Sequence, residues 1–420
     1  MPQSGRSDPT GIFLSFRLYP HFRLLWLSNL FFFGGTWSLT LILGWLVFDL
    51  THSEFLLALF TAVRLGPMLP GPISGVIADR FNRPRFLLAA VVWAFAAASA
   101  LAILVSIGRV TYWEIVVGGF CIGLAESPSQ PSRYTLVMDI VGRPHLTNAN
   151  ALNAIAMSTT QLVAPAIGGA LIAFCGAPAA LWVAALWYPV SLILLWLIRD
   201  IGTGATRIVH ESAIRQLVDG IRVVLTSRMM MSVLFVGLAA NVLIFPVFKT
   251  FMPVFAKSVL GLGPDGLGWM LASFGIGSTV GSLVIARLGN VKHTGSLFIF
   301  GTAAWGGLWA LFALSRSVPL SFALLAVAGF VGSAFDVLQS TLLLMLAPSR
   351  VRGRVLGLQE MVVGVLPLAI VIQGVIVHYL GLTLTTVLSG SLLMLLMVAL
   401  AITVPDLRRY TGYSQQHELS

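Results

Sequence analysis

A short charged stretch between two long apolar runs most constrains how this chain folds. The apolar runs cover about residues 55–78 and 86–107. Each is long enough for a helix to cross a bilayer core about 30 Å thick, which takes roughly 20 residues. So short a connection joins only neighbouring, antiparallel membrane helices. It places one carboxylate and three guanidinium groups at one membrane face.

The rest of the chain repeats this pattern of apolar runs. Of its 420 residues, 57% are hydrophobic and only 10% are charged, so lipid must solvate most of the surface. Alternating strand patterns are absent, which favours a helical bundle over a barrel. We therefore predict an all-α membrane protein with twelve transmembrane helices. Their centres lie near residues 36, 66, 96, 124, 162, 188, 244, 276, 304, 333, 365 and 392.

The formal net charge of +10 reflects membrane topology and not a nucleic-acid partner. With the N-terminus in the cytoplasm, twenty of the 25 Lys and Arg residues fall in the tails and the even-numbered gaps between spans, and only three fall in the opposite gaps. This is the positive-inside pattern. It predicts a multi-pass protein of the cytoplasmic (inner) membrane with both termini in the cytoplasm. The polar first twenty residues and the uncleaved first span are not typical of a secretory signal.

The chain divides into two similar halves. Residues 130–143 align with 339–352 at an offset of 209, and residues 76–78 align with 284–286 at an offset of 208. Parallel six-span repeats are a standard architecture of secondary transporters, in which the substrate binds between the halves. We thus expect two pseudo-symmetric six-helix bundles that work by alternating access.

The longest polar interval separates these halves. Its apolar residues recur at helical spacing from Ile214 to Val224, which predicts an amphipathic helix at the cytoplasmic surface. The predicted boundaries are a tail at 1–20, a bundle at 21–199, a linker at 200–228, a bundle at 229–404 and a tail at 405–420.

The charged loop carries a family resemblance. Gly75, Asp79, Arg80 and Arg83 match the loop between helices 2 and 3 of major facilitator superfamily transporters, which the chain resembles over its whole length. Asn82 stands where that family has Gly, and Asn tolerates the positive φ expected of the turn. The resemblance implies that the loop braces a cytoplasmic gate. It suggests three partners for the loop, which are Arg133 and Asp139 on the fourth span and Glu360 near the start of the eleventh.

A second motif lies in the fifth span. Pro165, Gly168 and Gly169 resemble the Gly-Pro-x-x-Gly-Gly motif of the family's proton-coupled exporters, with Ala164 in place of the first Gly. Small residues let helices approach closely and Pro bends the span, so ordinary tight packing is the alternative. Segments such as residues 148–153 are similar to the enterobactin-exporter-like and macrolide-efflux-like branch, whose relatives include lysophospholipid transporters.

Ionisable residues inside a span cost roughly 2.5–3.5 kcal/mol each on insertion scales, so they are candidates for function. Glu126 lies near the middle of the fourth span, beside Pro128 and Pro131. Irregular backbone at this depth is tolerated where it lines a cavity. A carboxyl group that is protonated when closed off and ionised when wet could carry a proton. The alternative is a buried ion pair with Arg64 or Arg133.

Asp336 in the tenth span, near the repeat position of Ser127, is a second proton-coupling candidate; a structural carboxylate is the alternative. Lys249 could contact an anionic substrate, pair with an acid or extend toward the interface. The candidates for the substrate cavity are polar or aromatic residues within the spans. They are Asn29, Trp37, Gln130, Asn241, Lys249 and Gln339.

These residues favour a proton-coupled exporter of small amphipathic compounds of drug or siderophore type. Symport uptake of a small metabolite and lysophospholipid translocation are the alternatives, and a receptor-like homologue that does not transport is a remote one. No Gly-Lys nucleotide loop, His-Glu-x-x-His helix or Cys/His metal spacing occurs in the sequence, so an enzyme is not expected. The expected partners are a small-molecule substrate, protons and the lipid bilayer. No cofactor or metal is expected, and the family resemblance implies a monomer.

Overall fold

The computed structural model describes residues 14–69, 82–200, 221–288, 293–347 and 352–411, and their regular structure is entirely helical. The first part contains α1 (Leu14–Leu18), α2 (Pro20–Thr51), α3 (Glu54–Leu65), the 3-10 turn η1 (Gly66–Met68), α5 (Arg83–Ser106) and α6 (Tyr112–Trp196). The second part begins with α8 (Arg228–Leu243), the π-helical turn η2 (Val247–Phe251), α9 (Met252–Val254) and the π-helical turn η3 (Phe255–Val259). It continues with α10 (Pro264–Leu288), α11 (Thr294–Leu314), α12 (Val318–Leu346), α13 (Arg352–Gly364), α14 (Leu366–Leu380), α15 (Leu382–Thr403) and α16 (Pro405–Arg409).

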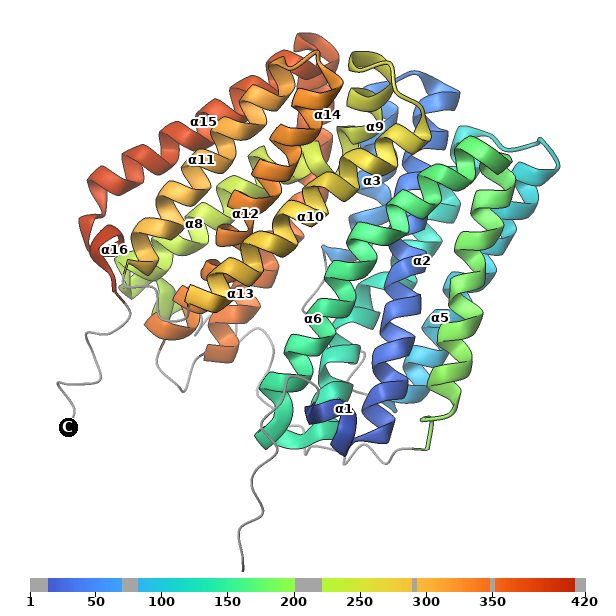
Figure 1. The fold of residues 1–420 in the computed structure, drawn as a ribbon, viewed down its shortest axis with the longest axis horizontal. Coiled ribbons are helices and arrows are strands. Elements are labelled where there is room, and N and C mark those ends of the chain that lie inside the picture. The colour runs from blue at the N-terminus through green and yellow to red at the C-terminus, as the bar shows by residue number, and fades with distance from the viewer. Residues whose placement is uncertain (1–13, 70–81, 201–220, 289–292, 348–351, 412–420) are drawn as a thin grey trace, which may run out of the picture.

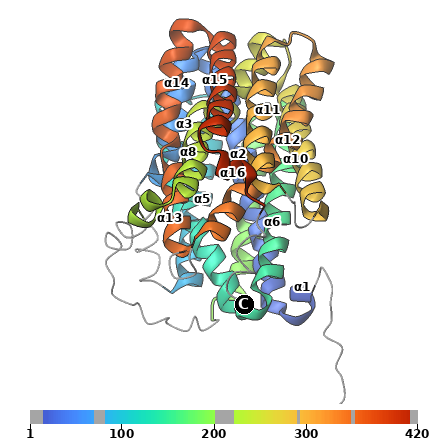
Figure 2. The ribbon, with the colours of Figure 1, turned by 90° about the vertical axis from the view of Figure 1, so that its left-hand side faces the viewer.

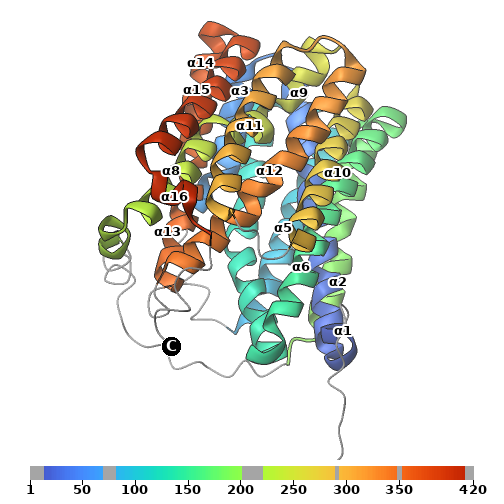
Figure 3. The same ribbon diagram turned by 60° about the vertical axis from the view of Figure 1, so that its left-hand side comes forward.

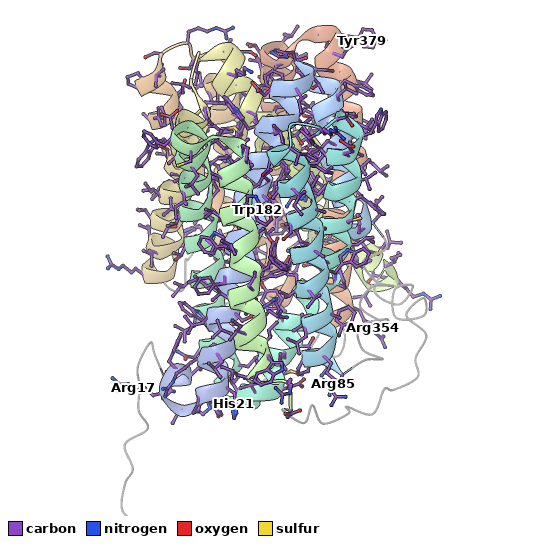
Figure 4. The ribbon with its side chains drawn as sticks, turned by 90° about the vertical axis from the view of Figure 1, so that its right-hand side faces the viewer. Arg17, His21, Arg85, Trp182, Arg354 and Tyr379 are labelled. Carbon is purple, nitrogen blue, oxygen red and sulfur yellow. The ribbon has the colours of Figure 1, made fainter. Side chains whose placement is uncertain are left out.

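The described helices have the length and surface of membrane spans. Nine helical segments in the described ranges are long and apolar enough to cross a bilayer. Large apolar side chains are exposed along them, for example Phe174 at 86% and Ile402 at 72%. Figure 4 shows Arg17, His21, Arg85 and Arg354 near one end of the molecule and Tyr379 at the other. An apolar belt with basic residues at one end fits a lipid surrounding.

Two glycines divide α6. Gly142 has φ 68° and ψ 174°, and Gly176 has φ 80° and ψ 167°. Neither conformation is helical, and a residue without a Cβ adopts positive φ at least cost. At 1.5 Å per residue an unbroken helix of this length would be about 130 Å long. The chain instead reverses at each glycine, which yields three consecutive stretches at 112–141, 143–175 and 177–196.

The helices form two groups that meet at one end. Figure 1 shows α2, α5 and α6 on one side and α8 with α10 to α16 on the other. Contacts between the groups join α3 to α14 and α6 to α10, and α10 runs beside α6 in Figures 1 and 3. Figure 2 shows α11, α15 and α16 in front of α2. The groups diverge toward the end where α1 and α13 lie (Figure 1).

Glycines set the closest helix approach. In α10, a Cβ added at Gly277 would clash with the Ala326 carbonyl of α12, and one added at Gly329 of α12 would clash with the Phe274 carbonyl of α10. Each helix therefore supplies a glycine where the other presents its backbone. Small residues of this kind drive helix association in lipid, where apolar burial alone gives no preference.

We expect Gly329→Val to destabilise the protein by about 1–3 kcal/mol, because overpacking forces the backbones of α10 and α12 apart. The measurement is thermal and denaturant unfolding of the purified protein in detergent. Gly357→Val is the matched control, since no atom lies within 4 Å of the position its Cβ would occupy. Equal stability of the two variants would contradict close α10–α12 packing.

Candidate functional site

A cavity of about 240 Å³ lies between the two groups of helices. Its wall is contributed by α2, α3 and α6 from one group and by η2, α9, α10, α13 and α14 from the other. Most of the lining is apolar, and its aromatic members are Phe32, Phe33, Trp37, Phe60 and Phe248. A mostly apolar cavity with a few polar groups is the usual form of a small-molecule site.

The cavity wall contains one ion pair. Arg64 Nη2 on α3 lies 3.0 Å from Glu126 Oε1 on α6 and 3.4 Å from Oε2. The same nitrogen donates to the carbonyl of Thr36 at 3.3 Å. Only 4% of the Arg64 side chain and 15% of the Glu126 side chain are exposed. The pairing with Arg64, one of the two alternatives considered for Glu126, is thus present.

The local sequence around Glu126 explains how a polar segment is kept at this depth. Pro128 and Pro131 lack backbone N–H groups, which removes donors from the helical ladder. The hydroxyl of Ser129 donates to the carbonyl of Ala125 at 2.5 Å, and that of Ser132 donates to the carbonyl of Pro128 at 2.8 Å. These bonds give the two hydroxyl groups acceptors within their own helix, as a membrane interior requires of polar groups.

Lys249 enters the cavity from the π-helical turn η2. Its Nζ lies 4.2 Å from the centroid of the Trp37 ring and 5.9 Å from that of Phe248. Pro246 and Pro253 flank the turn and interrupt the α-helical ladder. Wider π-helical turns of this kind are frequent at functional sites.

The six predicted cavity residues separate into two sets. Trp37, Gln130 and Lys249 line the cavity. Asn241 lies outside this lining, where its amide donates to the carbonyl of Gly237 at 2.9 Å. Gln339, also outside it, packs against Gly237, whose added Cβ would meet the Gln339 amide.

Asn29 belongs instead to a buried polar network inside the first group of helices. Its amide donates to Asn153 Oδ1 at 2.7 Å, and its Oδ1 accepts from Arg133 Nη1 at 2.5 Å. Arg133 is 1% exposed, also donates to Ser28 at 3.3 Å, and lies 4.2 Å from the Phe32 ring centroid. The network joins α2 to two stretches of α6.

The predicted gate is described only in part. Arg83 Nη1 on α5 lies 2.6 Å from Asp139 Oδ2 on α6, so two of the predicted residues form an ion pair. Gly75, Asp79 and Arg80 lie outside the described residues.

Asn82 and Glu360 were also expected in the gate region. Asn82 does not take the positive φ expected of it; at φ −63° and ψ 112° it caps α5, its Oδ1 accepting from the Arg85 amide at 3.3 Å. An N-cap side chain satisfies a free N–H of the first turn, which explains the extended backbone. Glu360 on α13 is exposed.

Asp336 is exposed on α12 and is not part of the cavity lining. An α-helix turns by 100° per residue, so Asp336 and the exposed Val327 lie on opposite sides of α12. Its charge acts on that of Lys249, although the two form no ion pair among the described residues.

The exporter-like motif lies where α6 meets α10 and α2. Pro165 lines the cavity. A Cβ added at Gly169 would clash with the carbonyl of Pro264, and one at Gly268 of α10 would lie 3.0 Å from the carbonyl of Pro165. Ser38 of α2 donates to the carbonyl of Ala164 at 3.2 Å. The motif therefore provides close helix packing beside the cavity.

Sequence reasoning missed most of the aromatic lining. Phe60 and Phe248 each lie in elements where most residues are apolar, so no local pattern distinguishes them. The prolines around Lys249 were a usable signal for the irregular turn.

The fold and the cavity are those of a multi-pass helical membrane protein with a chamber between two groups of helices. One solved structure, a POT family transporter in complex with 5-aminolevulinic acid, superposes with a TM-score of 0.76 at 11% identity, covering 93% of this chain and 97% of that one. The family described as transmembrane secretion effector matches residues 14–417. The chain belongs to this family of the major facilitator superfamily, as its motifs predicted, and is a transporter rather than an enzyme.

Two relatives illustrate the family. The chain is 25% identical over 373 residues to the multidrug efflux pump Tap of Mycolicibacterium fortuitum, covering 87% of this chain and 90% of Tap. It is 24% identical over 343 residues to the enterobactin exporter EntS of Shigella flexneri, covering 81% of each.

We expect Arg64→Gln to destabilise the protein by about 3–5 kcal/mol, because it leaves the Glu126 carboxylate buried without its partner. The double variant Arg64→Gln/Glu126→Gln should recover most of that loss. Unfolding in detergent is the measurement. Arg199→Gln, which breaks the more exposed pair with Asp200, is the control, with an effect of about 0–1 kcal/mol. Additive losses in the double variant would argue against a coupled pair.

Proposed function

We propose that the protein is a proton-coupled exporter of small amphipathic compounds, of drug or siderophore type, in the cytoplasmic (inner) membrane. The observation that carries the proposal is the Arg64–Glu126 pair in the wall of an otherwise apolar cavity between two groups of helices. The names of the relatives, a multidrug efflux pump and a siderophore exporter, support the direction of transport.

The proposed architecture has twelve spans in two six-helix bundles, with both termini in the cytoplasm. The three stretches of α6 support this count, as do the pairings of α3 with η1, α8 with its π-helical turns, and α13 with α14. The basic residues shown at one end of the molecule in Figure 4 support the orientation, because cytoplasmic ends carry the excess of Lys and Arg. A monomer is proposed.

Glu126 is the proposed proton carrier. When ionised it holds Arg64, and when protonated it releases this partner, so one proton changes the contact between α3 and α6. Such a change gives the cavity two arrangements that a proton and a substrate can bias. Asp336, whose charge acts on Lys249, is proposed as a second proton site.

The test of coupling is reconstitution in liposomes with an imposed proton gradient and a panel of dyes, macrolides and siderophores. We expect Glu126→Gln to lose substrate-dependent proton movement by at least about tenfold, since general proton transfer requires a group that titrates. Glu114→Gln makes the same substitution in the first turn of α6, where Glu114 accepts from the Thr111 amide, and should transport normally.

Wild-type rates with unchanged pH dependence in Glu126→Gln would remove the proton-carrier role. Substrate movement without proton movement in the wild type would indicate uniport or another ion. Accumulation of the substrate inside cells lacking the gene would support export, whereas depletion would support symport uptake.

The ion pair of Arg83 with Asp139 is proposed as part of the cytoplasmic gate, together with Gly75, Asp79, Arg80, Arg133 and Glu360. We expect Arg83→Gln to slow transport by roughly tenfold while substrate affinity stays the same, because gating limits the rate and not the binding. Asp79→Asn should act in the same way. Arg85→Gln, at a nearby exposed position on α5, is the control. Full-rate transport in Arg83→Gln would remove the gating role of this pair.

A further inference from the structure

Among the charged residues that line the cavity, Lys249 stands apart. Arg64 and Glu126 neutralise each other at 3.0 Å. Lys249 forms no ion pair or hydrogen bond within the described residues, and its ammonium group lies over aromatic rings instead. The other lysine of this helical region, Lys257, does have a carboxylate partner, Asp49. Among the described residues, the cavity wall therefore carries one positive charge without an ion-pair partner.

Its surroundings do not fully stabilise that charge. A cation at membrane depth costs more free energy than a cation–π contact returns. Asp336 offsets part of the charge from a distance but lies outside the lining and is exposed. The ammonium group is thus left able to bind a further anion from inside the cavity.

The remaining lining defines the rest of such a ligand. Trp37 and Phe248 flank the ammonium group, and Phe32, Phe33 and Phe60 extend the aromatic wall. Flat aromatic or alicyclic bodies pack well on such surfaces. We propose that the transported compound is an amphipathic organic anion whose carboxylate, sulfonate or comparable acid group is bound by Lys249. This assignment rests on the proposed function of the cavity as the substrate site.

Three probes of the same shape test the assignment: 2-naphthoate, 2-naphthamide and 2-naphthylmethylammonium. Their binding to the purified protein in detergent is measured by equilibrium dialysis. We expect the wild type to bind the carboxylate at least about tenfold more tightly than the ammonium compound, because opposite charges attract strongly away from water. Lys249→Gln should weaken carboxylate binding by about tenfold and leave amide binding within about twofold.

Unchanged amide binding shows that the variant cavity is intact. Lys249→Arg should retain the carboxylate preference, and Lys257→Gln, outside this lining, should leave all three affinities unchanged. Tighter binding of the ammonium compound, equal carboxylate binding by wild type and Lys249→Gln, or carboxylate binding weaker than about 1 mM would overturn the proposal.

Failure of the anion assignment can be distinguished from failure of the proposed exporter function. Proton-coupled transport of neutral or cationic compounds by the wild type, with no transport of anionic compounds, would remove the anion assignment and leave the exporter standing. A carboxylate preference without any transport would leave the binding site standing and remove the exporter.

Discussion

The cost of holding charge away from water is the constraint on which this structure depends. Helices in a bilayer satisfy their own backbone groups, so each ionisable side chain among them must find its partners on another helix. Arg64 and Glu126 find each other across α3 and α6. Arg133 finds an amide oxygen, a hydroxyl and an aromatic ring. These contacts fix how the helices of the first group pack. Three of these helices, α2, α3 and α6, form one side of the cavity wall.

The helical membrane character of the chain and its family could be predicted because both depend on features that are local in the sequence. Bilayer thickness sets the length of an apolar run, and Gly142 and Gly176 mark turns that no other residue makes as easily. Glu126 was identifiable for the same reason, since a carboxylate between apolar residues and prolines conflicts with its surroundings. The positive φ expected of Asn82 was wrong, because an Asn before Arg83 and Pro84 also makes a good helix cap.

The side of each helix that faces the cavity could not be predicted in the same way. A membrane helix is apolar on every side, so its periodicity does not identify the buried face. Asn29 and Trp37 lie on the same helix and are equally plausible as cavity residues, yet only Trp37 lines the cavity. Asn29 turns to Asn153, which is 124 residues away in the chain. Pairings over such distances leave no trace in a local pattern.

In the proposed mechanism, the charge of the ligand decides how a proton at Glu126 is coupled to it. A cation competes with a proton for the carboxylate, so exchange follows directly. An anion at Lys249 is helped by protonation of Glu126, because that step removes a negative charge from the same wall. Exchange of an anion for protons therefore requires that the two bind in different conformations. An inside-negative membrane potential also expels an anion, by about 2.3 kcal/mol per charge at 100 mV. In the proposed exchange the electrical part of the proton gradient therefore acts on both the anion and the proton, whereas the chemical part acts through the protonation of Glu126.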